Sequence, residues 1–151
     1  MDNQALLDGL RAAVPYNVHL GLEYVAIEPG RCTVRLPDDE RLRNHVGSQH
    51  ASGLFSLGEA ASGGAFTSAF AEQLAELRPL VTKAEIAYSK LALGASAAEA
   101  AIDEPLASIA QRLDNEGVVI FEVAVAMRDV HENEVAQMSV HWRMKRSGHR
   151  A

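Results

Sequence analysis

The feature that most constrains this chain is one long segment, residues 52–71, which is rich in Ala, Leu and Phe. Thr67 is its single β-branched residue, so the segment predicts a helix rather than a strand. Apolar residues lie on nearly all sides of that helix, and such a helix is typically buried. It therefore needs cover on more than one side. A curved sheet supplies most of that cover, and a second subunit could supply the rest.

The few polar side chains of this predicted helix lie on one stripe. Ser52, Ser56 and Glu59 are spaced four and three residues apart, which places them on the same helix face. Gly63 and Gly64, in the middle of the segment, weaken the helix by roughly 1 kcal/mol each relative to Ala. Small residues at those positions permit another backbone to approach closely.

The rest of the chain predicts mainly strands. Residues 3–13 have helical spacing and end near Pro15, and "LEYVAIEPGRCTVRLP" predicts a hairpin that turns at Pro29-Gly30. Four further strands are expected, at about 80–92, 95–103, 117–128 and 134–145. The last alternates most cleanly, with Ala136, Met138, Val140, Trp142 and Met144 on one face. The pattern predicts one α+β domain over residues 1–151, with a sheet of five to six antiparallel strands around the long helix. About 144–151 is expected to fray.

Composition excludes several classes of function. The net charge of −6 argues against a nucleic-acid surface, which needs a basic face. The single cysteine, Cys32, permits no internal disulfide and favours a cytoplasmic location. The acidic start of the chain is unlike a signal peptide, and no apolar run reaches the roughly 18 residues of a membrane span. The histidines outside residues 44–59 are scattered, so no metal site is expected.

The candidate chemistry lies in residues 44–59, "NHVGSQHASGLFSLGE". Asn44 precedes His50 by six residues, and His50 precedes Glu59 by nine. A helix that begins near His50 would point free N–H groups at a carbonyl oxygen or a developing oxyanion. Glu59 lies among Leu, Phe and Ala, so loss of hydration is expected to raise its pKa and suit it to act as general base or nucleophile. Alternatively, Glu59 only hydrogen-bonds the backbone or Ser56, and His50 only satisfies the loop.

The pattern N-x-x-G-x-x-H-x-x-G-x-x-x-x-x-E resembles the loop-and-helix signature of hotdog-fold thioesterases, with the phenylacetyl-CoA and 4-hydroxybenzoyl-CoA branches most similar. The hairpin "LGLEYVAIEPGRCTVRLP" and the strand "VTKAEIAYSKLALG" also resemble that group. The resemblance implies a helix wrapped by a sheet, and a homodimer or dimer of dimers with active sites shared between subunits. It implies hydrolysis of an acyl-CoA or acyl-carrier thioester, with CoA as part of the substrate and no separate cofactor.

The resemblance also implies roles for individual residues. Glu59 would attack the thioester or activate water, and Asn44 would position the nucleophile or that water. His50 would hold the loop or touch the carbonyl. The segment Ala51, Ser52 and Gly53 would bind the carbonyl at the helix N-terminus. The family has "HGG" where this chain has "HAS", so Ala51 and Ser52 replace the glycines that let a backbone approach a ligand closely.

Two further residues are candidates for substrate binding. Phe55 lines either the core or an acyl pocket. Thr82 either orients Glu59 or a water molecule, or is simply a β-former that fits the sheet.

Two other functions compete with hydrolysis. A hotdog dehydratase or hydratase uses a His and a Glu fourteen residues apart, and His45 and Glu59 have that spacing, although the Pro-Gly pair before the helix is missing. A non-catalytic module would keep the apolar acyl-binding pocket without turnover.

Overall fold

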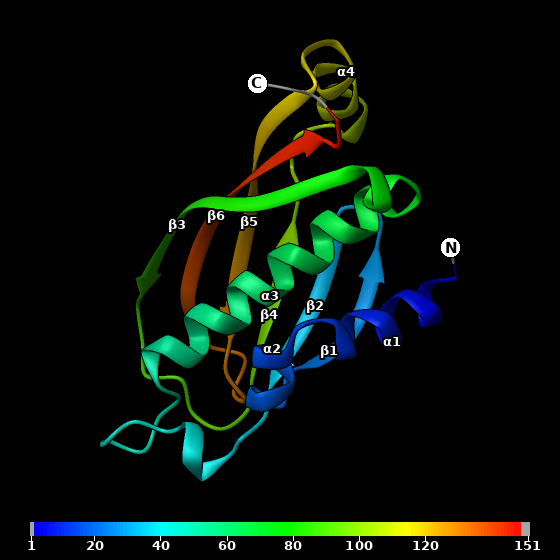
Figure 1. Ribbon diagram of the computed structural model, residues 1–151. Coiled ribbons are helices and arrows are strands. Elements are labelled where there is room, and N and C mark those ends of the chain that lie inside the picture. The colour runs from blue at the N-terminus through cyan, green and yellow to red at the C-terminus, as the bar shows by residue number, and fades with distance from the viewer. Residues whose placement is uncertain (1, 149–151) are drawn as a thin grey trace.

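The computed structural model describes residues 2–148, and these form one antiparallel sheet of six strands in the order β1-β2-β4-β5-β6-β3. The strands are β1 (Glu23–Glu28), β2 (Arg31–Leu36), β3 (Leu77–Tyr88), β4 (Ser96–Ala101), β5 (Val118–Arg128) and β6 (Glu134–Arg146). The helices are α1 (Asn3–Ala13), α2 (Pro15–Leu20), α3 (Ala51–Ala69) and α4 (Leu106–Glu116), with 3₁₀ turns η1 (Glu40–Leu42) and η2 (Ala71–Glu76). The sheet curves around α3, which confirms the hotdog fold expected from the sequence (Figure 1).

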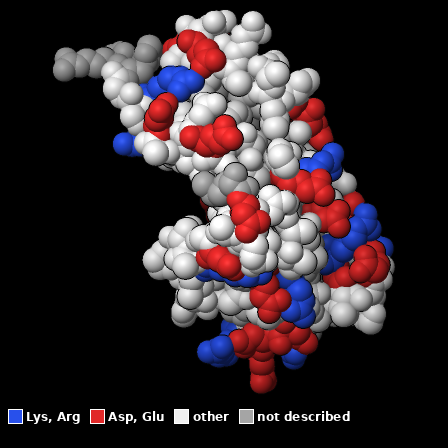
Figure 2. All heavy atoms as spheres, turned by 90° about the vertical axis from the view of Figure 1, so that its right-hand side faces the viewer, with Lys and Arg blue, Asp and Glu red and all other residues white. Residues whose placement is uncertain are grey.

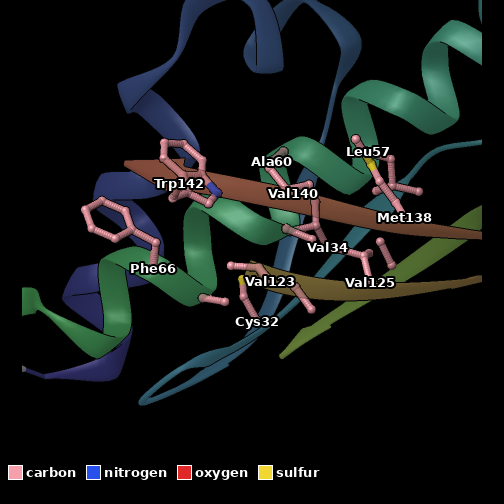
Figure 3. Packing of buried hydrophobic residues seen from close by; sticks show 14 of the residues in the cluster. Cys32, Val34, Leu57, Ala60, Phe66, Val123, Val125, Met138, Val140 and Trp142 are labelled. Atoms are coloured by element: carbon pink, nitrogen blue, oxygen red, sulfur yellow. The ribbon is translucent and has the colours of Figure 1, made fainter. Parts of the chain in front are cut away.

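Helix α3 is buried against the inner face of the sheet, because this contact removes its apolar side chains from water. Leu57, Ala60 and Phe66 point at the inward side chains of β2, β5 and β6 (Figure 3). One stripe of α3 stays partly open, between β3 on one side and α1 and α2 on the other (Figure 1). The stripe carries the exposed or half-buried residues Ser52, Phe55, Glu59, Gly63 and Thr67. We call these five residues the open stripe of α3.

The alternation predicted for the last strand is confirmed. Ala136, Met138, Val140, Trp142 and Met144 are all buried, while the residues between them are exposed or half-buried. The predicted hairpin is also confirmed, with Gly30 at φ 77° in its turn. Period-two burial is a local property of a strand that covers a core with one face, so the sequence alone was enough to predict it.

Helix α4 was missed by the sequence analysis, which expected strands to follow one another through this region. Ile109 and Leu113 are one turn apart and fully buried, and α4 packs on β5 and β6. The segment "DNEG" at 114–117 is the end of this helix, where Gly117 takes the left-handed conformation of a C-cap at φ 69°. The sequence analysis did not predict the short helix α2 or the turn η2 either.

Residues 144–146, expected to fray, instead complete β6. Met144 is fully buried, and the Arg146 guanidinium pairs with Asp114 of α4 and with Glu76 of η2. The backbone N–H of Ser147 also donates to the carbonyl of Glu76 at 2.7 Å. These contacts with α4 and η2 hold the strand end, and they could not be foreseen while both elements were unrecognised. The remaining part of the expected frayed segment, residues 149–151, lies outside the described residues.

The outer surface carries mixed charge. On the face in Figure 2, basic side chains lie interspersed with acidic ones, in keeping with a net charge of −6. A hollow of about 650 Å³ lies on the outer face of the sheet, over the small side chains of Ala101, Ala124, Ala126 and Ser139. None of its lining residues belongs to the candidate site.

Among the helices of residues 2–148, none is long and apolar enough to cross a membrane.

Candidate functional site

Asn44 organises the loop that leads into α3. Its side-chain oxygen accepts from the N–H groups of Val46 and Ser48, each at 3.1 Å. Its side-chain nitrogen donates to the Ser48 hydroxyl at 2.8 Å, and its own N–H donates to the Ser48 carbonyl. Gly47, at φ 80°, permits the tight turn that these bonds require. The amide of Asn44 is thus occupied by its own loop, and it shapes the approach to His50.

His50 is the N-cap residue of α3. Its Nδ1 accepts a hydrogen bond of 3.0 Å from the N–H of Ser52, and its backbone carbonyl accepts from Leu54. The ring therefore satisfies one of the N–H groups that every helix leaves open at its start. This is the loop-holding role considered in the sequence analysis. It leaves Nε2 pointing away from the cap.

The first turn of α3 keeps two open N–H groups. Within residues 2–148, neither the N–H of Ala51 nor that of Gly53 donates a hydrogen bond. Ala51 is exposed and Gly53 is buried. Ala51 and Ser52 have no positive φ, so the helical backbone of "HAS" does not require glycine for its conformation. Ala51 is accordingly a feasible oxyanion donor.

Glu59 lies on the open stripe, about two turns into α3, and is half-buried. Loss of hydration on burial raises its pKa above the ordinary carboxyl range. Among the described residues its carboxylate forms no ion pair and no hydrogen bond. Ser56, proposed as an alternative partner, donates instead to the carbonyl of Ser52. Glu59 is close enough to Tyr24 for its charge to add to the burial that raises the pKa of that phenol to about 12.

Two aromatic side chains lie near the start of α3, Phe55 on the open stripe and Tyr88 at the end of β3. Phe55 is 37% exposed, which is unusual for a phenylalanine in a helix that is otherwise buried. Tyr88 ends the edge strand β3, and its hydroxyl donates to the carbonyl of Ala51 at 3.0 Å. The sequence analysis considered Phe55 as lining of either the core or an acyl pocket, and it did not single out Tyr88. No periodicity could reveal a contact between residues 37 positions apart.

Thr82 lies at a bulge in β3, where Val81 pairs with Trp142 and Lys83 pairs with His141. Its hydroxyl donates to the carbonyl of His141, on the neighbouring strand β6, at 3.3 Å. His45 lies exposed at the tip of the loop, outside α3.

Gln49 is a supporting residue that the sequence analysis missed. It is 3% exposed, and its side-chain nitrogen donates to the carbonyls of Pro37 and Gly94 at 3.0 and 2.9 Å. Its backbone N–H donates to the carbonyl of Ala92. These bonds tie the residue before His50 to the loop after β2 and to the loop between β3 and β4. The burial of this side chain, which the sequence does not show, is what marks Gln49 as a support of the loop.

Metal ligands are not gathered at this site. Over residues 2–148, no three His, Cys, Asp or Glu side chains are placed to hold a metal ion.

Comparison with known proteins agrees with this architecture. A family described as a domain of unknown function (DUF4442) matches residues 2–144. A probable thioesterase of unknown function from Pseudomonas aeruginosa superposes with a TM-score of 0.87 at 22% identity, covering 97% of each chain. A thioesterase family protein from Silicibacter pomeroyi superposes with a TM-score of 0.77 at 19% identity, and the match covers 95% of this chain and 98% of that one. The E. coli PaaI protein from the phenylacetic acid degradation operon superposes with a TM-score of 0.72 at 15% identity. The match covers 96% of this chain and 93% of the PaaI chain. No curated protein matches the chain in sequence.

Proposed function

This chain belongs to the DUF4442 family, and we propose that it hydrolyses an acyl thioester presented on CoA or on an acyl carrier. The observation that carries the proposal is Glu59, a half-buried carboxylate without a partner among the described residues. It lies about two turns beyond the start of α3, where the N–H groups of Ala51 and Gly53 donate no hydrogen bond among the described residues. Burying a charge without a partner costs stability, so the fold retains Glu59 at a cost that a catalytic role would explain.

In the proposed reaction the thioester carbonyl oxygen accepts a hydrogen bond from the N–H of Ala51, at the positive end of α3. Glu59 takes a proton from a water molecule as that water attacks the carbonyl carbon. The C–S bond then breaks, and the proton passes to the departing thiolate, which leaves an acid and a thiol. Direct attack by the Glu59 carboxylate, followed by hydrolysis of the anhydride, gives the same products. CoA enters only as part of the substrate, and no other cofactor is proposed.

The acyl group is proposed to be a small aryl or a medium-length alkyl chain, because Phe55 offers an exposed aromatic surface on the open stripe. A reducing cytoplasm is the proposed compartment. The only thiol, Cys32, is buried, and that burial raises its pKa to about 12.

Two copies of the chain are proposed to share each active site. Ala51 and Glu59 lie about 12 Å apart along their own helix, at 1.5 Å per residue. A single carbonyl group must place its oxygen about 3 Å from the donor and its carbon about 3 Å from the nucleophile. A second copy whose α3 runs antiparallel would bring its Glu59 to this Ala51. The open stripe and the mostly exposed edge strand β3 are the surfaces such a partner would cover.

The first experiment measures thiol release with a thiol-reactive dye across aryl- and alkyl-acyl-CoAs. Cys32 contributes little background because it is buried and its pKa is raised. Glu59→Gln is expected to lower hydrolysis roughly 10²–10⁴-fold, the usual contribution of a positioned base. Glu116→Gln, an exposed carboxylate on α4, is the matched control and should behave as wild type. Full activity in Glu59→Gln would refute the assignment. Acyl-CoA binding without thiol release would favour the binding module, and altered unsaturation without thiol release would favour the dehydratase.

A second experiment tests the shared site with Ala51→Pro. Proline is tolerated at the first position of a helix, and His50, at φ −66° and ψ 141°, already has the backbone that precedes a proline. The variant removes the candidate oxyanion donor, so hydrolysis should fall about 10²–10³-fold. Mixing inactive Ala51→Pro with inactive Glu59→Gln should restore about a quarter of wild-type activity if a two-fold dimer shares its sites. No restoration after subunit exchange would place both residues in sites within single chains.

A further inference from the structure

Tyr88 and His50 are joined through one peptide group at the start of α3. The Tyr88 hydroxyl donates to the carbonyl of Ala51 at 3.0 Å. The N–H of the same peptide group belongs to Ser52, and it donates to Nδ1 of His50 at 3.0 Å. The peptide between Ala51 and Ser52 is therefore hydrogen-bonded at both ends by side chains, one from the edge strand and one from the loop.

This chain of bonds decides which nitrogen of His50 carries its hydrogen. A neutral imidazole has one N–H donor and one acceptor nitrogen. Because Nδ1 accepts from Ser52, the hydrogen must lie on Nε2. Hydrogen bonds that share a peptide group polarise one another, so a donor on the Ala51 carbonyl strengthens the Ser52 N–H as a donor to the ring.

We propose that Tyr88 is a positioning residue that acts through the Ala51–Ser52 peptide to hold His50 as an Nε2–H donor directed away from the cap. The inference rests on the proposed thioester hydrolysis, in which that N–H becomes a second donor near the carbonyl, beside the N–H of Ala51. Tyr88 is 47% exposed and ends an edge strand, so its ring contributes little to the core. Among the described residues, the Tyr88 hydroxyl forms one hydrogen bond, and the acceptor is the carbonyl of this peptide group.

The test compares Tyr88→Phe with Tyr16→Phe, an exposed tyrosine on α2 that serves as the matched control. Losing one neutral hydrogen bond should lower kcat roughly 2–10-fold with little change in KM, because the bond orders the site rather than binding substrate. Amide exchange at Ser52 should quicken several-fold, and nitrogen-15 shifts of the neutral His50 ring should show less of the Nε2–H form. Tyr16→Phe should change none of these. Unchanged kcat and unchanged Ser52 exchange in Tyr88→Phe would overturn the proposal.

A second pair of variants separates capping by His50 from donation by His50. Asparagine is a favoured N-cap whose side-chain oxygen can accept from Ser52, but it is too short to replace the Nε2–H group. His50→Asn should therefore unfold at the wild-type temperature yet lose at least tenfold in kcat, whereas His50→Ala should lose both stability and activity. Full turnover by His50→Asn would overturn the role of Nε2–H. The exchange and nitrogen-15 measurements need no turnover, so they decide the positioning by Tyr88 even if wild type hydrolyses none of the thioesters.

Discussion

The two halves of α3 are built from similar residues but are packed very differently. Towards its C-terminal end, Phe66 stacks on Trp142 with ring centroids 5.4 Å apart (Figure 3). Phe70 and Phe121 complete an aromatic cluster. Towards its N-terminal end the helix leaves the N–H of Ala51 and the carboxylate of Glu59 without partners among the described residues.

The difference shows how one helix can serve both stability and chemistry. Ser62 lies between the halves, fully buried, accepting from the indole N–H of Trp142 at 3.0 Å and donating to the carbonyl of Glu59 at 2.7 Å. The aromatic half fixes the helix on the sheet. The other half can then hold polar groups that would destabilise an isolated element.

The largest expected effect on stability contrasts Gly64 with Gly58. A Cβ at Gly64 would lie 2.3 Å from Sγ and 2.9 Å from Cβ of Cys32, and a cysteine on β2 cannot swing aside. Gly64→Ala should lower the free energy of unfolding by roughly 1–3 kcal/mol. A Cβ at Gly58 would meet the flexible ends of Met127 and Met138, so Gly58→Ala should cost clearly less. Chemical denaturation measures both, and equal costs would contradict the contrast between the halves.

Ser62→Ala should have the next largest effect. It leaves the buried N–H of Trp142 unpaired, at a cost of roughly 1–3 kcal/mol. Ser56→Ala is the control on the other half, because the Ser56 hydroxyl bonds only back to its own helix, at the carbonyl of Ser52. That variant should stay within about 0.5 kcal/mol of wild type. Urea midpoints of the two variants measure both costs. If Ser56→Ala lost as much stability as Ser62→Ala, the stabilising contacts of α3 would not be limited to its aromatic half.

Glu59 should make stability depend on pH in a particular direction. Burial raises its folded pKa above the unfolded value, so the protonated form fits the fold better. The stabilisation is complete below the unfolded pKa and is lost as the pH rises through the folded one. Glu59→Gln cannot ionise, so its stability should match wild type in acid and exceed it increasingly towards neutral pH. Melting temperatures of wild type and Glu59→Gln, measured from acid to neutral pH, test this direction. A difference between the two proteins that does not change with pH would contradict the prediction.

The smallest expected effect concerns Gly63, on the open stripe. A Cβ there would meet only Trp142, at an ordinary 3.6 Å, so the single chain tolerates Gly63→Ala. Alanine should then stabilise the helix by up to about 1 kcal/mol. If a second α3 approaches the open stripe closely, the same change should instead weaken the dimer. Sedimentation at several concentrations, beside thermal unfolding, distinguishes these outcomes.

Local patterns predicted the elements that depend on neighbours along the chain. The apolar run of α3, the hairpin at Pro29-Gly30 and the alternation of β6 are all recorded in short-range spacing. Helix α4 had such a signal as well, with Ile109 and Leu113 four residues apart and Gly117 at its end. That signal was overlooked because consecutive strands were expected to be joined directly.

By itself, the sequence determined that α3 must be buried, and it placed Asn44, His50 and Glu59 in order along one loop and helix. The tertiary structure decided how each polar group is used. The Asn44 side chain hydrogen-bonds within its own turn and His50 caps α3, whereas the Glu59 carboxylate has no partner within residues 2–148. Tyr88 reaches Ala51 from a strand 37 residues away. Periodicity records which face of an element is apolar, but only the folded chain fixes which distant groups come within hydrogen-bonding distance.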